Sequence, residues 1–424
     1  MGRQLISGFV SATIFFTEII SRPFMRSHLS VIVGFLFVVG CATALFTGRN
    51  QFIVVSEGQE ASLGDEAYRQ TLRDSVVTHD FNAERLVRRV GEKIAAVANK
   101  PEYKWEFTII NDPETVNVFA LHGGKVAVYT GIFGPARDEA GLAVVMGHEV
   151  AHALARHPAE RMSQGILLQL GGVGLGVALG RNPEVANQVL QACCIGTGVG
   201  VALPFGRSQE TEADHIGLIL MAKAGYDPRV ALDLWERMEK KEGGKGAPPE
   251  FLSTHPGYET RVEQLRSFLP EALSYYQPSG VRVESLPLPD SLDTAAAKSE
   301  RELLKRVAAL NRYVLEQNGE RAVVEALAYQ LGVNPQLVIQ ERQQLSLGYG
   351  EYAALRGVAY LGRGSLKRIA DGYQRGRSWA ELPTDNGSRV NELMAWMGEL
   401  IRTTSNIDRQ LKGQQQRPNT RLRP

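Results

Sequence analysis

The stretch His148-Glu149-Val150-Ala151-His152 decides how this chain is interpreted, because it places three chemically active side chains on one predicted helix. On a helix, residues four positions apart lie one turn above each other, so His148 and His152 can reach one cation from the same face. Glu149 lies about 100° around the helix from His148, which places its carboxylate beside such a cation rather than on it. From that position it can take a proton from metal-bound water.

The apolar residues around this stretch predict one helix from Glu139 to His157. Two histidines do not complete a zinc site, which takes a third protein ligand and leaves the fourth position to water. A histidine ten residues after His148 would supply that ligand, but Pro158 occupies the position. His157 lies roughly 140° around the predicted helix from His152, so it cannot join the site while the helix continues. The third ligand must therefore come from another element.

A second predicted helix, residues 208–224, offers carboxylates for this purpose. Glu210 and Asp214 are four residues apart and share one face of that helix. One of them could bind the metal while the other accepts a hydrogen bond from a ligand imidazole, as groups behind metal-bound histidines commonly do. The spacing by itself leaves open which residue takes which part.

Composition and charge exclude several other classes of protein. The chain has 424 residues, of which 44% are hydrophobic and 22% charged, so it can form roughly two or three packed domains. With 47 Lys and Arg against 46 Asp and Glu, its net charge of +1 gives no reason to expect a nucleic-acid partner. Cys41, Cys193 and Cys194 are too few for a disulfide scaffold or a zinc ribbon. Any metal must be held by histidine and carboxylate.

The amino-terminal region has the features of a membrane-targeting signal. Residues 29–46 carry no charge, and Val38-Val39-Gly40-Cys41 resembles the lipobox of bacterial lipoproteins, whose cysteine is acylated. We therefore expect residues 1–41 to be a signal peptide, whose start lies at Met25 if the first 24 residues are an over-extended start, and a lipidated Cys41 to anchor the protein. The alternative is an uncleaved inner-membrane signal anchor, because the apolar run is just long enough to span a bilayer.

The apolar periodicity and the proline content divide the remaining chain into helical, β-rich and proline-rich parts. Amphipathic helices are predicted at 66–77 and 84–98, and alternating β-rich stretches at 105–110, 117–121 and 125–129 predict a small sheet. The boundaries that we expect are a tether over 42–60, a first domain over 61–274, a linker over 275–299, a helical interaction module over 300–403 and a basic disordered tail over 404–424.

Residues 165–206 are unusually rich in glycine and small apolar side chains. We interpret them as a close-packed pair of helices or as a flap over a cleft. A membrane hairpin is the alternative. Several polar residues dilute the segment and disfavour that alternative.

In combination, these motifs resemble peptidase family M48, specifically its bacterial lipoprotein branch. The resemblance covers residues 41–270, a little over half the chain. The matching stretches are Cys41-Ala42-Thr43, Thr47-Gly48-Arg49, Gln59-Glu60, Leu63-Gly64, Asn117 to Gly131, the His148 motif, Glu210 to Asp214, and Ser253-Thr254-His255-Pro256 with Arg261.

The resemblance implies an α+β fold: a mainly helical, gluzincin-type metalloprotease domain with a small β-sheet, followed by an all-helical C-terminal module. It implies one Zn²⁺ per chain, with His148, His152 and Glu210 as ligands and Glu149 as general base and acid.

The same resemblance implies roles for residues around the metal. Asp214 would orient a ligand imidazole, and Arg261 would hold a substrate carbonyl or the surroundings of the catalytic glutamate. His255 would approach the zinc, either as a self-inhibiting switch or as a transition-state contact. Two departures from the family pattern, His122 for proline and Gly206 for serine, concern the flap and the cleft edge rather than a proposed ligand.

The expected function is a zinc endopeptidase of the bacterial cell envelope that cleaves unfolded or misassembled polypeptides. The strand at 125–129 would offer an edge on which an extended peptide pairs. Ala42, which follows Cys41, lacks the aspartate associated with inner-membrane retention, so we expect a periplasmic enzyme on the outer membrane. The alternative is an envelope-binding, chaperone-like lipoprotein with latent peptidase activity, whose residues 300–403 recruit a protein partner.

Overall fold

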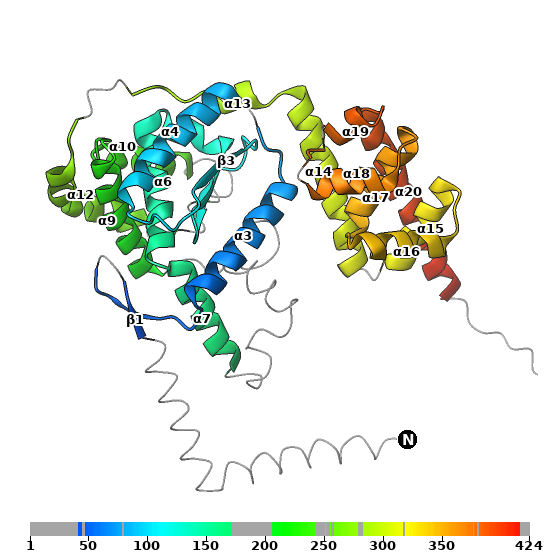
Figure 1. The fold of residues 1–424 in the computed structure, drawn as a ribbon, viewed down its shortest axis with the longest axis horizontal. Helices are drawn as coiled ribbons and strands as arrows, with labels where there is room; N and C mark the ends of the chain where they lie inside the picture. The colour runs from blue at the N-terminus through cyan, green and yellow to red at the C-terminus, as the bar shows by residue number, and fades with distance from the viewer. Residues whose placement is uncertain are drawn as a thin grey trace, which may run out of the picture.

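The structure is a computed structural model, and its described residues form two bodies joined near α13 (Pro289–Leu292) (Figure 1). They are mainly helical with a small sheet, so the predicted α+β class is confirmed. The signal peptide before Cys41, Cys193-Cys194 and most of the glycine-rich segment lie outside the described residues. The residues that the structure describes are 41–44, 47–78, 80–170, 206–242, 251, 255, 258–278, 283–316, 319–375, 377–379 and 381–415.

A three-stranded sheet lies in the first body. Its strands are β3 (Glu106–Ile110), β4 (Val118–Leu121) and β5 (Lys125–Tyr129), in the order β3-β5-β4. The central strand β5 pairs parallel with β3 and antiparallel with β4. The prediction that β5 offers a free edge is therefore wrong, because both of its edges are already paired. Among the described residues, the two edge strands are β3, whose outer side has an isolated bridge from Ile110 to Val77, and β4, whose outer side has no strand partner.

Helix α6 (Glu139–Leu154) carries the His148 motif through the centre of this body. Asp138 caps it, since its side chain accepts a hydrogen bond from the Gly141 amide at 2.9 Å. Every residue of α6 is buried, because the helix packs against β4, α4 (Phe81–Val97) and α9 (Arg207–Lys223).

The end of α6 differs from the predicted helix. The helix stops at Leu154, Arg156 adopts a φ of 55°, and α7 (His157–Leu170) then begins in a new direction. Pro158 fits the first turn of α7, where a missing amide hydrogen costs nothing, whereas it would interrupt a continuous helix. As a result, His157 is not held on the helical face where the sequence analysis placed it.

The crossing of α6 and α9 depends on two glycines. A Cβ atom on Gly147 would lie 2.9 Å from the Gly217 carbonyl oxygen, and one on Gly217 would lie 2.9 Å from the backbone nitrogen of His148. The two backbones therefore touch at this point. Because Glu210 and Asp214 stand one to two turns before Gly217, the contact brings both carboxylates to the histidines of α6.

Other segments complete the first body. An amino-terminal hairpin of β1 (Cys41–Thr43) and β2 (Asn50–Phe52) packs on α7, so the structure differs from the tether predicted over 42–60. Leu286 and Leu292 belong to the apolar core, so part of the predicted linker 275–299 is packed against this body. The remaining elements are α3 (Glu57–Arg73), the 3-10 turn η1 (Thr130–Ile132), α5 (Phe133–Ala136), α10 (Val230–Glu242) and α12 (Tyr258–Tyr275).

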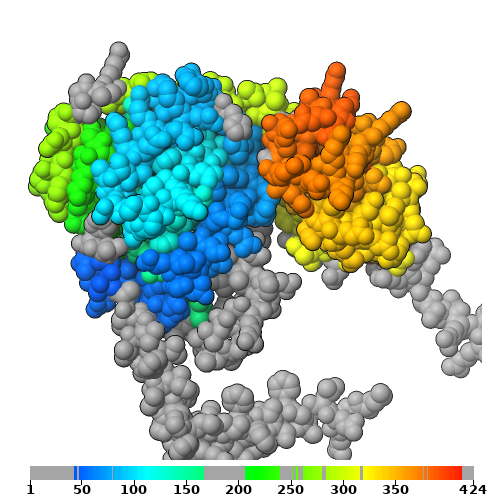
Figure 2. Space-filling view, viewed as in Figure 1, coloured from blue at the N-terminus to red at the C-terminus, as the bar shows by residue number. Residues whose placement is uncertain are grey.

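The second body is a helical bundle with its own apolar core. Figure 2 shows it beside the first body, and Val76, from the turn after α3, belongs to the bundle's core cluster. Its last helix runs to Gln415, past the predicted boundary at 404, because Ile407 still packs on that cluster. The helices are α14 (Ala295–Glu316), α15 (Glu320–Leu331), α16 (Pro335–Leu345), α17 (Tyr349–Leu361), α18 (Leu366–Gln374), α19 (Glu381–Asp385) and α20 (Val390–Gln415).

None of the helices within the described ranges combines the length and the apolar character that crossing a bilayer requires.

Candidate active site

Three buried side chains from two helices converge between α6 and α9. The Nε2 atoms of His148 and His152 lie 3.0 Å apart. The Glu210 carboxylate reaches both rings, with Oε1 3.5 Å from Nε2 of His152 and Oε2 3.6 Å from Nε2 of His148. Ligand atoms of a tetrahedral zinc site stand roughly 3.3 Å from each other, because each bond to the ion is about 2.0–2.1 Å long. The three side chains thus have the spacing of a zinc ligand set.

The Glu210 carboxylate also shows that these residues fit a cation. Both of its oxygens are buried and have no hydrogen-bond partner among the described residues. Burying a carboxylate without hydrogen bonds costs several kcal/mol, and the Arg261 guanidinium, 3.3 Å from Oε2, offsets only part of that cost. A divalent cation between Glu210 and the two imidazoles would compensate this cost.

Asp214 and Arg261 lie behind His148. Asp214 Oδ1 stands 2.9 Å from Nδ1 of His148, so it can accept the Nδ1 hydrogen bond and leave Nε2 facing the other ligands. The Arg261 guanidinium donates to Asp214 Oδ1 at 2.6 Å and stacks on Trp235, 3.6 Å from the ring centroid. It also lies 3.3 Å from Glu210 Oε2. Arg261 therefore holds Glu210 and Asp214 of α9 in place rather than projecting into solvent.

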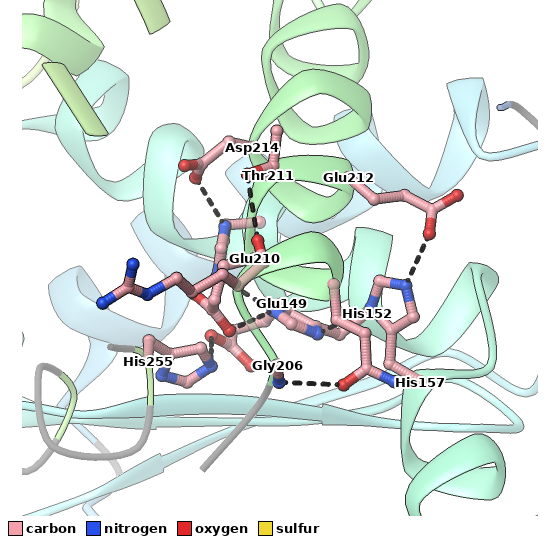
Figure 3. A network of polar contacts seen from close by, with 12 residues as sticks. Glu149, His152, His157, Gly206, Glu210, Thr211, Glu212, Asp214 and His255 are labelled. Atoms are coloured by element: carbon pink, nitrogen blue, oxygen red, sulfur yellow. Dashed lines mark hydrogen bonds and ion pairs between the residues drawn. The ribbon is translucent and has the colours of Figure 1, made fainter. Parts of the chain in front are cut away.

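Glu149 and His255 face each other at the front of the ligand set (Figure 3). Nε2 of His255 lies 3.4 Å from Oε1 of Glu149, and its Nδ1 donates to the Phe251 carbonyl at 2.9 Å. Burial raises the pKa of the Glu149 carboxyl to about 8, and a cation beside it would lower that pKa again. His255 belongs, with the three ligand candidates, to a group whose donor atoms all lie within 4.8 Å of one another.

The structure brings His157 and Glu212 to the site, and the sequence analysis missed both. Nδ1 of His157 lies 2.9 Å from Nδ1 of His152, and its Nε2 lies 3.1 Å from Oε2 of Glu212 (Figure 3). The signal that could have found His157 is Pro158, which marks a helix boundary just before it. Glu212 had no such signal, because its partner is brought near only by the break between α6 and α7.

The other predicted positions make contacts outside this ligand set. Cys41 begins β1 and pairs with Phe52 of β2. His122, one of the two departures from the family pattern, is buried, with its Nδ1 2.8 Å from the Tyr103 hydroxyl and 3.5 Å from Glu60. Gly206 caps α9, where its amide donates to the Gln209 side chain.

Comparison with known proteins points to one kind of enzyme. Residues 82–269 match the family model described as Peptidase family M48. The chain is 36% identical over 245 residues to the mitochondrial metalloendopeptidase OMA1 of Schizosaccharomyces pombe, a match that covers 57% of this chain and 70% of that protein. It is 30% identical over 302 residues to the Saccharomyces cerevisiae protein of the same name, covering 65% of this chain and 84% of that one. It is also 30% identical over 224 residues to the beta-barrel assembly-enhancing protease of Escherichia coli K12, covering 52% and 46% of the two chains.

Proposed function

The chain belongs to peptidase family M48 and is a zinc metalloendopeptidase that acts on polypeptides, and on this premise we propose that His148, His152 and Glu210 hold its metal ion. The observation that carries the proposal is the unsatisfied Glu210 carboxylate, 3.5 and 3.6 Å from two imidazole nitrogens that themselves stand 3.0 Å apart. Asp214 and Arg261 then act as positioning residues, because they fix His148 and Glu210 from behind.

Glu149 is the general base and acid in this proposal. Zinc, when bound, supplies a Lewis acid that activates water and polarises a carbonyl group. The Glu149 carboxylate is placed beside the ligand set, where it accepts a proton from the attacking water and returns it to the leaving amine. Burial of the whole group excludes competing solvent and strengthens each of these electrostatic interactions.

The outer edge of β4 is the place where a substrate would pair. This strand packs directly on α6 and has no strand partner on its outer side among the described residues. An extended peptide added there forms backbone hydrogen bonds, which read the main chain more than the side chains. Such recognition favours unfolded or misassembled polypeptides, since folded proteins have few extended segments to offer.

We also propose that His255 would block the metal site at rest. Its Nε2 points toward Glu149 and the ligand set, while its Nδ1 is held by the Phe251 carbonyl. His255→Ala is then expected to raise basal cleavage. A fall in cleavage would instead assign His255 to the transition state.

The cell envelope is the setting that we propose, with lipidated Cys41 as the outer-membrane anchor and quality control as the role. Two observations support it: the lipobox-like sequence, and similarity to a relative whose name refers to β-barrel assembly. Because β1 begins at Cys41 and its hairpin packs on α7, an acylated Cys41 would hold the catalytic body close to the bilayer. Cys41→Ala should abolish labelling of the chain by fatty acid, whereas an uncleaved signal anchor would carry no such label with or without Cys41.

Glu149→Gln tests the enzymatic proposal in the full chain. Casein cleavage should fall by about 100-fold or more, because general acid–base catalysis contributes that much. Zinc content should stay near that of the unmodified chain, since Glu149 is not one of the three ligands. Retained cleavage would contradict the assignment. The alternative, in which residues 300–403 recruit an envelope partner and cleavage is incidental, predicts that the variant keeps its cellular role.

A further inference from the structure

A chain of polar contacts joins the amino-terminal hairpin to one of the proposed metal ligands. It starts at Thr47-Gly48-Arg49, the turn between β1 and β2, for which the proposed reaction has no use. It ends at His152. Thr47 is exposed and Arg49 half-buried, whereas Glu212, His157 and His152 are buried, and each step is a short contact between side chains.

Side chains of this turn donate hydrogen bonds to two glutamates. The Arg49 guanidinium donates to both oxygens of Glu160 at 2.8 and 2.7 Å, and its Nε donates to Oε2 of Glu212 at 2.8 Å. The Thr47 hydroxyl donates to the other oxygen of Glu212. Gly48 adopts a φ of +68°, a conformation that favours glycine, and this lets both neighbours face the same carboxylate.

A second contact fixes the hairpin at the end of α6. The Gln51 side chain donates to the Ala155 carbonyl at 2.7 Å, and Ile53 packs on Ala159 and Met162 of α7. The hairpin is thus held at the break where α6 gives way to α7. This is the same break that turns His157 toward His152.

The hydrogen-bond roles along the chain follow from the groups themselves. An ionised carboxylate only accepts, so Nε2 of His157 donates to Glu212 across 3.1 Å. In a neutral imidazole whose Nε2 carries the hydrogen, Nδ1 is an acceptor. Nδ1 of His152, 2.9 Å away, must therefore donate to it. This leaves Nε2 of His152 without a hydrogen, which is the form that binds a metal ion.

We propose that Thr47, Arg49, Glu212 and His157 form a positioning relay that sets the tautomer and the ring orientation of His152. Docking of the β1–β2 hairpin, immediately after Cys41, then contributes to zinc affinity. The proposal rests on the proposed function, in which His152 is a ligand. It differs from the Asp214 contact because it acts on the other histidine and reaches it from a segment about 100 residues earlier in the chain.

Zinc affinity of the purified full chain tests the relay, measured by competition with a chromogenic chelator. His157→Phe removes the acceptor for His152 and should weaken zinc binding about 10- to 100-fold, as loss of such partners typically does. Arg49→Gln leaves His157 in place and should weaken it less, by roughly fivefold. The cobalt-substituted variants should show a shifted visible absorption band, because the geometry at the ligand changes.

Arg89→Gln is the matched control. Arg89 pairs with the buried Glu139 at 2.5 Å and with Glu284 at 2.7 Å, but none of these contacts reaches the metal centre. The Arg89→Gln substitution should lower the melting temperature of the metal-free chain without changing zinc affinity or the cobalt spectrum. Glu212→Gln, which keeps the shape of the side chain, replaces His157→Phe if that variant does not fold.

His152→Ala distinguishes a failure of the ligand assignment from a failure of the relay. If it retains zinc binding, the ligand assignment itself is wrong. If it loses zinc while Arg49→Gln and His157→Phe, or Glu212→Gln in its place, bind within about twofold of the unmodified chain, the ligand assignment stands and the relay is overturned.

Discussion

The two bodies of this protein bury different kinds of side chain. Around the crossing of α6 and α9, the interior contains charged groups that are less than 6% exposed: Glu149, Glu210, Glu212, Asp214 and Arg261. In the bundle, the buried polar and charged residues among those described are Glu300, Ser388 and Thr404. A buried charge costs several kcal/mol unless it is paired. The charged groups of the site therefore lower the stability of the first body. Changes of equal size should therefore have different consequences in the two bodies.

Among the changes that should affect the two bodies differently, Gly217→Ala should have the largest effect. Its new Cβ would stand 2.9 Å from a backbone nitrogen of α6, so the two helices must move apart and carry Glu210 away from the histidines. We expect zinc affinity to fall at least about a thousandfold, roughly 4 kcal/mol. Competition with a chelator measures this loss.

Gly350→Ala supplies the matched change in the bundle, where a Cβ would collide with the Val307 carbonyl between α17 and α14. It should lower stability by about 1–3 kcal/mol without altering zinc affinity per folded molecule. If Gly217→Ala binds zinc normally, the helix crossing does not set the position of the ligands.

Arg261→Gln comes next in expected size. The substitution leaves Asp214 and Glu210 buried without their guanidinium, and we expect the metal-free chain to lose about 3 kcal/mol of unfolding free energy. Arg321→Gln in the bundle breaks an exposed pair with Glu325 and should cost about 0.5 kcal/mol or less. Urea unfolding with and without zinc measures both. Equal losses would mean that the charged interior is no more sensitive than the bundle surface.

Part of the arrangement of the candidate ligands could be predicted because it follows local rules. His148 and His152, like Glu210 and Asp214, share a helix face through their spacing of four residues, whatever the rest of the fold does. The end of α6 was missed because the apolar pattern continues past Leu154 and outweighed Pro158 in the interpretation. His157 was therefore excluded for a reason that held only while the helix continued.

Contacts between elements that are distant in the chain could not be predicted from the sequence. The order β3-β5-β4 requires β5 to pair with a strand that is not its neighbour in the chain, and alternation of apolar residues contains no information about that choice. The contact between Gly147 and Gly217 could not be predicted from the sequence either, because a single glycine within a helix has several explanations. Both relations shape the proposed site, one through the β4 edge proposed for substrate and the other through the candidate ligands.

The pH dependence of stability should also originate in the first body. Glu60 of α3 is 3% exposed, and burial raises its pKa to about 7 from an ordinary value near 4.5, although Arg156 donates to it at 2.8 Å. The folded chain therefore holds a proton that the unfolded chain releases between these two values. The contribution of Glu60 to stability is largest below pH 4.5 and falls by an amount on the order of 3 kcal/mol as pH rises to 7.

Glu60→Gln should remove this decline, because the amide does not titrate. Unfolding free energies measured from pH 4.5 to 7.5 would show a flatter profile for the variant than for the unmodified chain. Glu341→Gln makes the same chemical change in the bundle, where the carboxylate accepts from the Tyr352 hydroxyl and reaches solvent, and it should leave the slope unaltered. An unchanged slope in Glu60→Gln would show that Glu60 is ionised in the folded chain, with the Arg156 contact outweighing the cost of burial.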